Sequence, residues 1–297
     1  MNAPAPQLRD PSAAGALAAL FRPVALRSPL RLTTVSAWVE HIPFALNLVD
    51  LVRPRRLVEL GTHAGDSYCA FCQGVTAFRL DTLCYAVDTW RGDPQAGTYG
   101  DEVLTDLRRH HDPLYGAFSR LVQSTFDDAQ VHFADGSIDL LHIDGLHTFD
   151  AAQHDFETWR SKLAPGAVVL FHDTNVREGD FGVWKLWREL ASSHRWSFEF
   201  PHGHGLGVLA PEEPPDVLRP LFQASPEEQV AIREVYAQLG HGVERERQLR
   251  ASLSLIDELR HEIGHRESEV TELRADISRL EERERALTQQ LHEENLA

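Results

Sequence analysis

The sequence predicts a doubly wound α/β domain with a mostly parallel sheet, followed by a helical tail. Between residues 35 and 211, short apolar runs of four to six residues alternate with segments of helical periodicity. This alternation is typical of a parallel sheet with helices on both faces. The last two apolar runs are separated by a turn short enough for a hairpin. From residue 249 onward, apolar residues follow a heptad pattern instead.

The predicted strands are apolar runs bounded by turn-forming residues. They cover 56–60, 83–87, 120–123, 138–143, 167–171, 197–200 and 205–209. Apolar residues at helical spacing fill the intervals between them. We expect helices over 35–52, 66–78, a segment ending near 110, 127–133, 149–163 and 182–193.

Composition divides the 297 residues into four parts. Residues 1–34 are rich in proline and alanine and are expected to form a flexible leader. Residues 35–211 form the α/β domain, which has enough apolar residues to bury a core. Residues 212–240 are predicted to be a linker with a short helix. Residues 241–297 contain no aromatic residue and form the predicted coiled coil.

The heptad pattern of the tail consists of two apolar rows. The first row holds Leu249, Ile256, Ile263, Val270, Ile277 and Leu291, interrupted only by Glu284. The second row holds Leu259, Leu273, Leu280 and Leu287, interrupted by Ser252 and Arg266. β-Branched residues in the first row and leucine in the second favour a parallel two-stranded coiled coil, and hence a homodimer. A single amphipathic helix lying on the domain is the alternative.

Charge and cysteine content exclude several classes of function. A formal net charge of −16 argues against general binding to nucleic acid or to an anionic membrane, because both need a basic face. No apolar run is long enough to span a bilayer, and we expect no secretory signal. The three cysteines do not form a disulfide framework, which is typical of a reducing compartment. The sequence therefore predicts a cytoplasmic protein.

The end of the first predicted strand carries the pattern E-x-G-x-x-x-G. Its residues run from Glu59 through Gly61, Thr62 and His63 to Gly65. The glycines let the backbone turn sharply and approach a ligand, and the following helix directs its N-terminal amides at it. A tight strand–helix turn without a ligand is the alternative. The pattern lacks the further glycine or lysine of a phosphate-binding loop.

This pattern resembles the S-adenosylmethionine motif of Rossmann-like methyltransferases. In that family the glycines approach the methionine part of the cofactor, and the acidic residue helps to fix the loop. The resemblance implies that Asp88, which ends the second strand, binds the ribose hydroxyls, although a helix cap or a surface position is also possible. It also implies that Ser124, after the third strand, lies on the adenine side of the pocket. A mostly parallel sheet with a terminal hairpin is the layout of the same family.

Two further strands end in acidic residues and histidines. Asp144 follows the strand 138–143, and His172 and Asp173 follow the strand 167–171. Adjacent strand ends would bring the two aspartates into one pocket, where they repel each other unless a cation or a proton lies between them. Carboxylate oxygens of this kind suit Mg²⁺, with Mn²⁺ or Ca²⁺ as alternatives.

The sequence I-D-G-L-H, which ends at His147, is similar to the signature of metal-dependent O-methyltransferases that modify sugars, such as those of macrolide and aminocoumarin glycosides. The resemblance covers residues 38–209. It implies that Asp144 and Asp173 bind a divalent cation, Mg²⁺ above all, and that His147 is the general base. His172 is either a third ligand or a residue behind the ligands. A surface histidine is the alternative for His147.

The resemblance therefore implies an S-adenosylmethionine-dependent enzyme that methylates a sugar hydroxyl of a glycan or glycoside. Sequences of this kind occur beside glycosyltransferases in polysaccharide synthesis, so a glycosyltransferase is a candidate partner. The loop 88–100 carries a tryptophan and a tyrosine that would stack on a sugar, and the loop 175–180 would form the opposite wall. A non-catalytic module assembled by the coiled coil and a methyltransferase for a non-sugar molecule are the alternatives.

Overall fold

The structure is a computed structural model that describes residues 20–93, 95 and 97–294. Within these residues, seven strands form one sheet in the order β5-β2-β1-β6-β7-β9-β8. The strands are β1 (Arg56–Leu60), β2 (Leu83–Asp88), β5 (Ser119–Gln123), β6 (Ile138–Ile143), β7 (Leu163–His172), β8 (Trp196–Phe200) and β9 (Leu206–Ala210). The first five of these are parallel, and β9 and β8 add an antiparallel hairpin to β7. The predicted fold class is confirmed.

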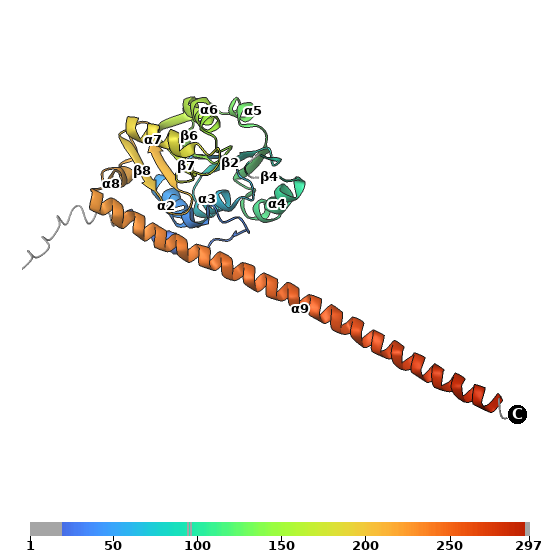
Figure 1. Ribbon diagram of the computed structural model, residues 1–297. Helices are drawn as coiled ribbons and strands as arrows, with labels where there is room; N and C mark the ends of the chain where they lie inside the picture. Colours follow the sequence, from blue (N-terminus) through green and yellow to red (C-terminus); the bar gives the residue numbers. More distant parts are fainter. Residues whose placement is uncertain (1–19, 94, 96, 295–297) are drawn as a thin grey trace, which may run out of the picture. The chain divides into compact units, whose positions relative to one another are not determined.

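Helices cover both faces of the sheet, and each face buries its own apolar cluster (Figure 1). On one face lie α2 (Ile42–Val52), α3 (Asp66–Phe78) and α4 (Asp101–Tyr115). On the other face lie α5 (Phe126–Gln130), α6 (Phe149–Trp159) and α7 (Val183–Ser193). The short elements are η1 (Pro23–Leu26), η2 (Val39–His41), β3 (Gly92–Asp93), β4 (Gly97–Thr98), η3 (Arg160–Lys162), η4 (Asp216–Leu218) and α8 (Arg219–Phe222).

The order of the strands determines where a ligand can bind. β1 lies between β2 and β6, so the chain winds in opposite directions on the two sides of β1. The connections separate at this point and leave a crevice beyond the carboxyl ends of the strands. The loops that follow β1, β2, β6 and β7 meet there, and they carry the residues that the sequence analysis singled out.

Both predicted boundaries of the domain differ from the structure. Most of the predicted leader, residues 1–19, lies outside the described residues, but Leu20 and Val24 are buried in the core. The predicted linker 212–240 also packs on the domain, because the long helix α9 (Pro226–Glu294) buries Ile232 and Tyr236 in its first turns. The ring of Phe21 stacks on that of Tyr236 with centroids 5.5 Å apart. Apolar residues at both ends thus extend the core beyond the predicted limits.

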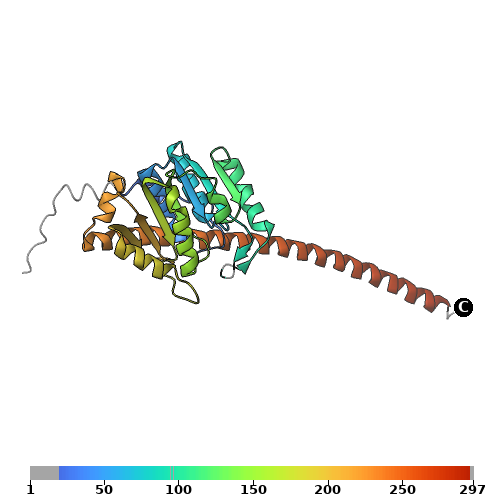
Figure 2. The same cartoon turned by 90° about the horizontal axis from the view of Figure 1, so that it is seen from above.

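The compact unit ends at Arg245, and residues 246–297 form a second unit. In the second unit the described residues, up to Glu294, continue α9 (Figures 1 and 2). Its apolar residues remain exposed, with Ile263 57% and Leu273 55% accessible. No helix among the described residues is both long and apolar enough to cross a membrane.

Candidate active site

A cavity of about 740 Å³ opens at the carboxyl ends of the strands. Its volume suits a ligand of the size of a nucleotide cofactor or a drug. Most of the residues that the sequence analysis selected line it, namely Gly61, Thr62, His63, Gly65, Asp88, Asp144, His147, His172 and Asp173. Glu59 and Ser124 do not.

Gly61 allows the loop after β1 to touch the loop after β6. Its φ is +84°, and a Cβ at this position would lie 2.0 Å from the carbonyl oxygen of Asp144. The amide of Asp144 donates to the carbonyl of Leu60 at 2.8 Å. The two loops therefore approach so closely that only glycine fits at position 61.

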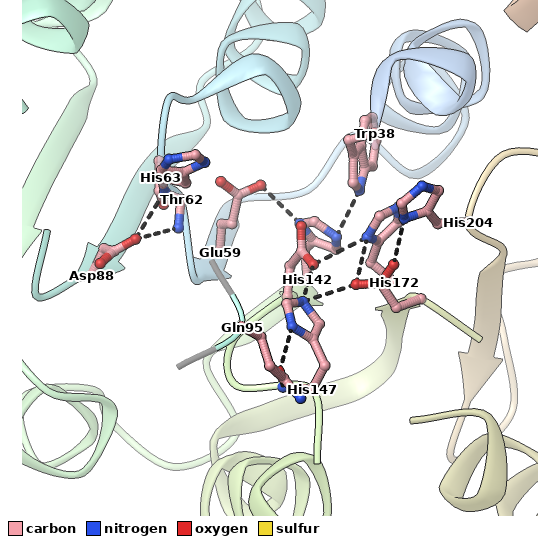
Figure 3. Close-up of polar contacts among 12 residues, drawn as sticks. Trp38, Glu59, Thr62, His63, Asp88, Gln95, His142, His147, His172 and His204 are labelled. Carbon is pink, nitrogen blue, oxygen red and sulfur yellow. Dashed lines mark hydrogen bonds and ion pairs between the residues drawn. The ribbon is translucent and has the colours of Figure 1, made fainter. Parts of the chain in front are cut away.

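Asp88 holds the loop after β1 through its carboxylate. One oxygen accepts hydrogen bonds from the amides of Thr62 and His63, both at 2.8 Å (Figure 3). The other oxygen accepts from the amide of Trp90 at 2.7 Å. The ribose role of Asp88 stays a prediction, and the structure adds that this side chain organises two loops. Trp90 itself is buried, and its indole donates to the carbonyl of His63, so it is not available to stack on a substrate.

Glu59 acts inside the protein rather than in the cavity. Its buried carboxylate accepts from Nδ1 of His142 at 2.8 Å, and Nε2 of His142 accepts from the indole of Trp38 at 3.1 Å (Figure 3). Burial raises the pKa of Glu59, while the bond from His142 opposes the shift. Trp38, which lines the cavity, is thus fixed by a chain of bonds that begins at the motif's acidic residue.

Ser124 lies outside the cavity, contrary to the expectation for the adenine side. Its amide donates to the carbonyl of Asp88 and so continues the sheet, while its side chain lines a separate surface hollow. The next two residues, Thr125 and Phe126, turn into the cavity instead. Thr125 caps α5, and the backbone turns at this cap. The residues that line the cavity are therefore Thr125 and Phe126, which follow Ser124 in the chain.

Two aspartates and three histidines form a cluster at the ends of β6 and β7 (Figure 3). Nε2 of His147 lies 2.8 Å from Asp173 and 3.4 Å from Asp144. Nδ1 of His172 lies 3.1 Å from Asp144 and 3.3 Å from Asp173. His204, which precedes β9, contacts Asp173 at 3.1 Å from its other side. The structure therefore brings the predicted acidic pair together.

The charges of this cluster compensate one another. Burial would raise the pKa of both aspartates, but the charge of His172 and hydrogen bonds from the histidines hold both pKa values well below their usual range. Burial lowers the pKa of His147, yet its bonds to Asp144 and Asp173 outweigh this and raise it to about 9. The pKa of His172 is also raised, because the two carboxylates outweigh its burial. Positive charge is thus favoured between the aspartates.

The same cluster has the donors of a cation site. Single donor atoms of Asp144, His147 and Asp173 all lie within 4.8 Å of one another, which one ion could span after small shifts. Asp173 has a left-handed backbone with φ of +60°, a strained conformation that is common at functional sites. Two carboxylates suit Mg²⁺ or Mn²⁺, and the imidazoles favour Mn²⁺ or another transition metal.

Gln95 fixes the orientation of His147. Its side-chain oxygen accepts from the amide of His147 at 2.9 Å and lies 3.0 Å from Nδ1 (Figure 3). Since this oxygen can only accept, Nδ1 carries a proton, and the raised pKa of the ring means that Nε2 is protonated as well and donates to Asp173. Phe181 stacks on the ring of His147. Gln95 lies in the loop 88–100, which the sequence predicts to contact the substrate, but no local motif marks this residue as functional.

Residues 58–174 match a protein family described as "Methyltransferase domain". The chain is also 53% identical over 174 residues to an uncharacterized protein, y4gI, of Sinorhizobium fredii. The aligned region covers 59% of this chain but only 19% of that protein. The chain thus spans about a fifth of the curated relative that it matches.

Two solved structures illustrate the structural similarity. The O-methyltransferase of Bacillus cereus in complex with SAH is 14% identical, with a TM-score of 0.44 over 68% of this chain and 91% of that one. The O-methyltransferase TomG of Streptomyces achromogenes, involved in tomaymycin synthesis, is 14% identical, with a TM-score of 0.44 over 68% and 89%. Similarity at this level says nothing about the substrate of the present chain.

The similarity to a methyltransferase domain concerns the central part of the sheet. The matched segment begins in β1 and ends just beyond β7, so it contains most of the residues that line the cavity. The antiparallel hairpin of β8 and β9 completes the sheet outside the matched segment. Residues 58–174 therefore match a methyltransferase domain, within a mostly parallel sheet that ends in an antiparallel hairpin.

Proposed function

We propose that this domain transfers the methyl group of S-adenosylmethionine to a hydroxyl oxygen of a sugar, in a glycan or glycoside, with the help of a divalent cation. The observation that carries the proposal is the cluster of Asp144, Asp173 and His147 on one wall of a cavity whose other wall is the glycine-containing loop after β1.

The wall formed by β1 and β2 supports binding of the cofactor. Gly61 and Gly65 bring backbone into the cavity, and Asp88 holds the amides of residues 62 and 63 in place. One oxygen of Asp88 accepts a single hydrogen bond from the described residues and has a further lone pair for a ribose hydroxyl. We assign the ribose to this side of the cavity and the transferred methyl group to the side of Asp144.

The wall formed by β6 and β7 supports the chemistry. Asp144 and Asp173 would hold the cation, with His172 as a third ligand, because Nδ1 of this buried ring lies against both carboxylates. A bound cation would lower the pKa of an acceptor hydroxyl and fix its orientation. The two aspartates raise the pKa of His147, and a cation bound to them would cancel that effect, so that the neutral ring could take the hydroxyl proton. The ring is partly exposed to the cavity and is held by Gln95.

Aromatic side chains around the cavity support a sugar acceptor. Tyr99, Phe126 and Phe181 line it from three different segments of the chain. Aromatic faces pack well on the C–H faces of sugars, while the histidines and aspartates offer partners for hydroxyl groups. Tyr99 belongs to the loop that the sequence analysis proposed for this role.

Cofactor binding is tested by calorimetric titration of the full-length chain with S-adenosylmethionine. We expect binding by the wild type and at least tenfold weaker binding by Asp88→Asn, which removes the charge that holds the loop. Asp81→Asn is the matched control, because Asp81 is exposed at the opposite end of β2. Absence of binding by the wild type would contradict the proposal.

The roles of the two histidines are tested with nucleotide sugars and oligosaccharides as acceptors, with and without chelator. His147→Ala should lose methyl transfer but keep Mn²⁺ binding, whereas His172→Ala should weaken Mn²⁺ binding. The reverse outcome would exchange the two roles. Cofactor binding without transfer to any acceptor would contradict the proposed reaction and favour a non-catalytic module.

A further inference from the structure

The second unit of the chain presents an apolar stripe that needs a partner. Between residues 256 and 291 the stripe is made of exposed side chains, with Leu280 64% and Leu287 53% accessible. Exposed stripes of this length on a helix mark an interaction surface. Two charged residues interrupt the stripe within this stretch, namely Arg266 and Glu284.

The apolar residues alone would allow a parallel pair of helices, but the two charged residues argue against it. In a parallel dimer each residue of the stripe meets its own copy across the interface. Arg266 would then face Arg266, and Glu284 would face Glu284. Like charges in a largely apolar interface are costly, because they lose hydration and repel each other.

An antiparallel pair can match the two charges instead. In the register centred on position 275, Arg266 of one copy lies opposite Glu284 of the other, and the two-fold symmetry forms this pair twice. Between residues 259 and 291 the other layers of the stripe in this register remain apolar on both sides. They pair Leu273 with Ile277, Val270 with Leu280, Ile263 with Leu287 and Leu259 with Leu291.

Neighbouring registers do not give this match. A shift of the register centre by half a heptad places Arg266 opposite Ile277 and Glu284 opposite Leu259, so both charges would face apolar side chains. Beside the matched pair, Glu269 of one copy also meets Arg283 of the other. Some like charges, such as Arg274 with its own copy, meet at the flanks, where solvent weakens their repulsion.

We propose that two copies of the chain pair through residues 259–291 as an antiparallel coiled coil in this register. The occupant of the apolar stripe is thus a second copy of the same chain. Charge complementarity selects both its direction and its register. This inference concerns the second unit and is independent of the proposed methyl transfer.

The charge match is tested by sedimentation of full-length variants. Arg266→Glu should raise the dimer dissociation constant about tenfold or more, because it places two glutamates opposite each other. The double variant Arg266→Glu with Glu284→Arg should restore dimerisation, since it exchanges the two charges. A monomeric wild type, or a double variant that dimerises no better than the single one, would overturn the proposal.

The direction is tested by disulfide formation between full-length variants. Leu259→Cys and Leu291→Cys should form a mixed covalent dimer when combined, and neither should form one alone. The three native cysteines are buried and free, so the wild type is a suitable control. A covalent dimer of Leu259→Cys alone would show a parallel pair and overturn the register.

Discussion

The role of each residue in the site depends on the face of the sheet toward which its side chain points. Val58 and Leu60 face one apolar cluster, while Leu57 faces the other, as alternation along β1 requires. Glu59 therefore points with Leu57 toward the layer of α2 and α3, where it meets His142. The acidic residue of the motif supports the cavity from behind and does not line it.

The first prediction for a single residue tests whether Gln95 orients His147. Gln95→Ala should lower kcat about 10- to 100-fold, because such supporting contacts orient the group that they touch. The KM for S-adenosylmethionine should stay unchanged, since the contact lies on the acceptor side. Steady-state kinetics measure both constants.

The matched control is Asp180→Ala, which removes a different partner of the Gln95 side chain but leaves its contact with His147. We expect a smaller loss of kcat for this variant. If both variants lost the same kcat, the effect would come from disturbing the loops that carry Gln95 and Asp180 and not from the orientation of the His147 ring.

Asp155 in α6 is predicted to make the free energy of unfolding depend on pH. Burial raises the pKa of this carboxyl to about 7, above its value in the unfolded chain, so the folded state binds the proton more tightly. The free energy of unfolding should therefore fall as pH rises from about 4 to about 7. Asp155→Asn should stabilise the protein by about 1–3 kcal/mol at pH 8 and have little effect at pH 4.

Denaturant unfolding of both proteins at the two pH values measures this difference. Asp150→Asn, at an exposed position in the first turn of the same helix, is the control. A stabilisation that does not change with pH would contradict the predicted titration.

At the scale of elements, the site depends on loops that touch one another. The loop after β1 contacts the loop after β6 at Gly61, and the hairpin of β3 and β4 contributes Gln95 to His147. Each loop follows a different strand, so the sheet fixes their distance from one another. A change in one loop should therefore alter the whole cavity.

Gly61→Ala tests this contact. The new methyl group would collide with the carbonyl of Asp144 in a backbone that also disfavours alanine, so we expect a loss of about 2–4 kcal/mol in unfolding free energy. Cofactor binding should be lost as well. Thermal unfolding and calorimetry measure the two effects.

Gly136→Ala is the control that distinguishes backbone strain from the steric clash expected for Gly61→Ala. Gly136 has φ of +65° but no atom within 4 Å of a Cβ, so only the backbone conformation is disfavoured. For Gly136→Ala we expect the free energy of unfolding to fall by about 1 kcal/mol and cofactor binding to stay normal. If Gly61→Ala and Gly136→Ala lost the same free energy of unfolding, the steric clash at Gly61 would be refuted.

At the scale of the whole molecule, the long helix α9 belongs to two units. Its first part, up to Arg245, buries Ile232 and Tyr236 in the core of the domain, whereas the part from Glu246 buries none of its described side chains. The helix thus completes one hydrophobic core and offers a surface for another.

Two truncations test this division. A chain that ends at residue 245 should keep the stability and cofactor binding of the domain but should not dimerise. A chain that ends at residue 225 should lose several kcal/mol of stability, since removal of one large buried side chain alone costs about 2–5 kcal/mol. Sedimentation and denaturant unfolding measure both results, and a stable domain ending at 225 would contradict the division.

The sequence alone determined the sheet, the strand ends that deliver Asp144 and Asp173, and the heptad stripe. These features follow from short apolar runs and from fixed periodicities, which are properties of neighbouring residues. The tertiary structure alone decided that Gln95 orients His147, that Trp38 lines the cavity and that Ser124 does not. Contacts between residues that are far apart in the chain depend on how loops and strands pack, and no local pattern encodes that packing.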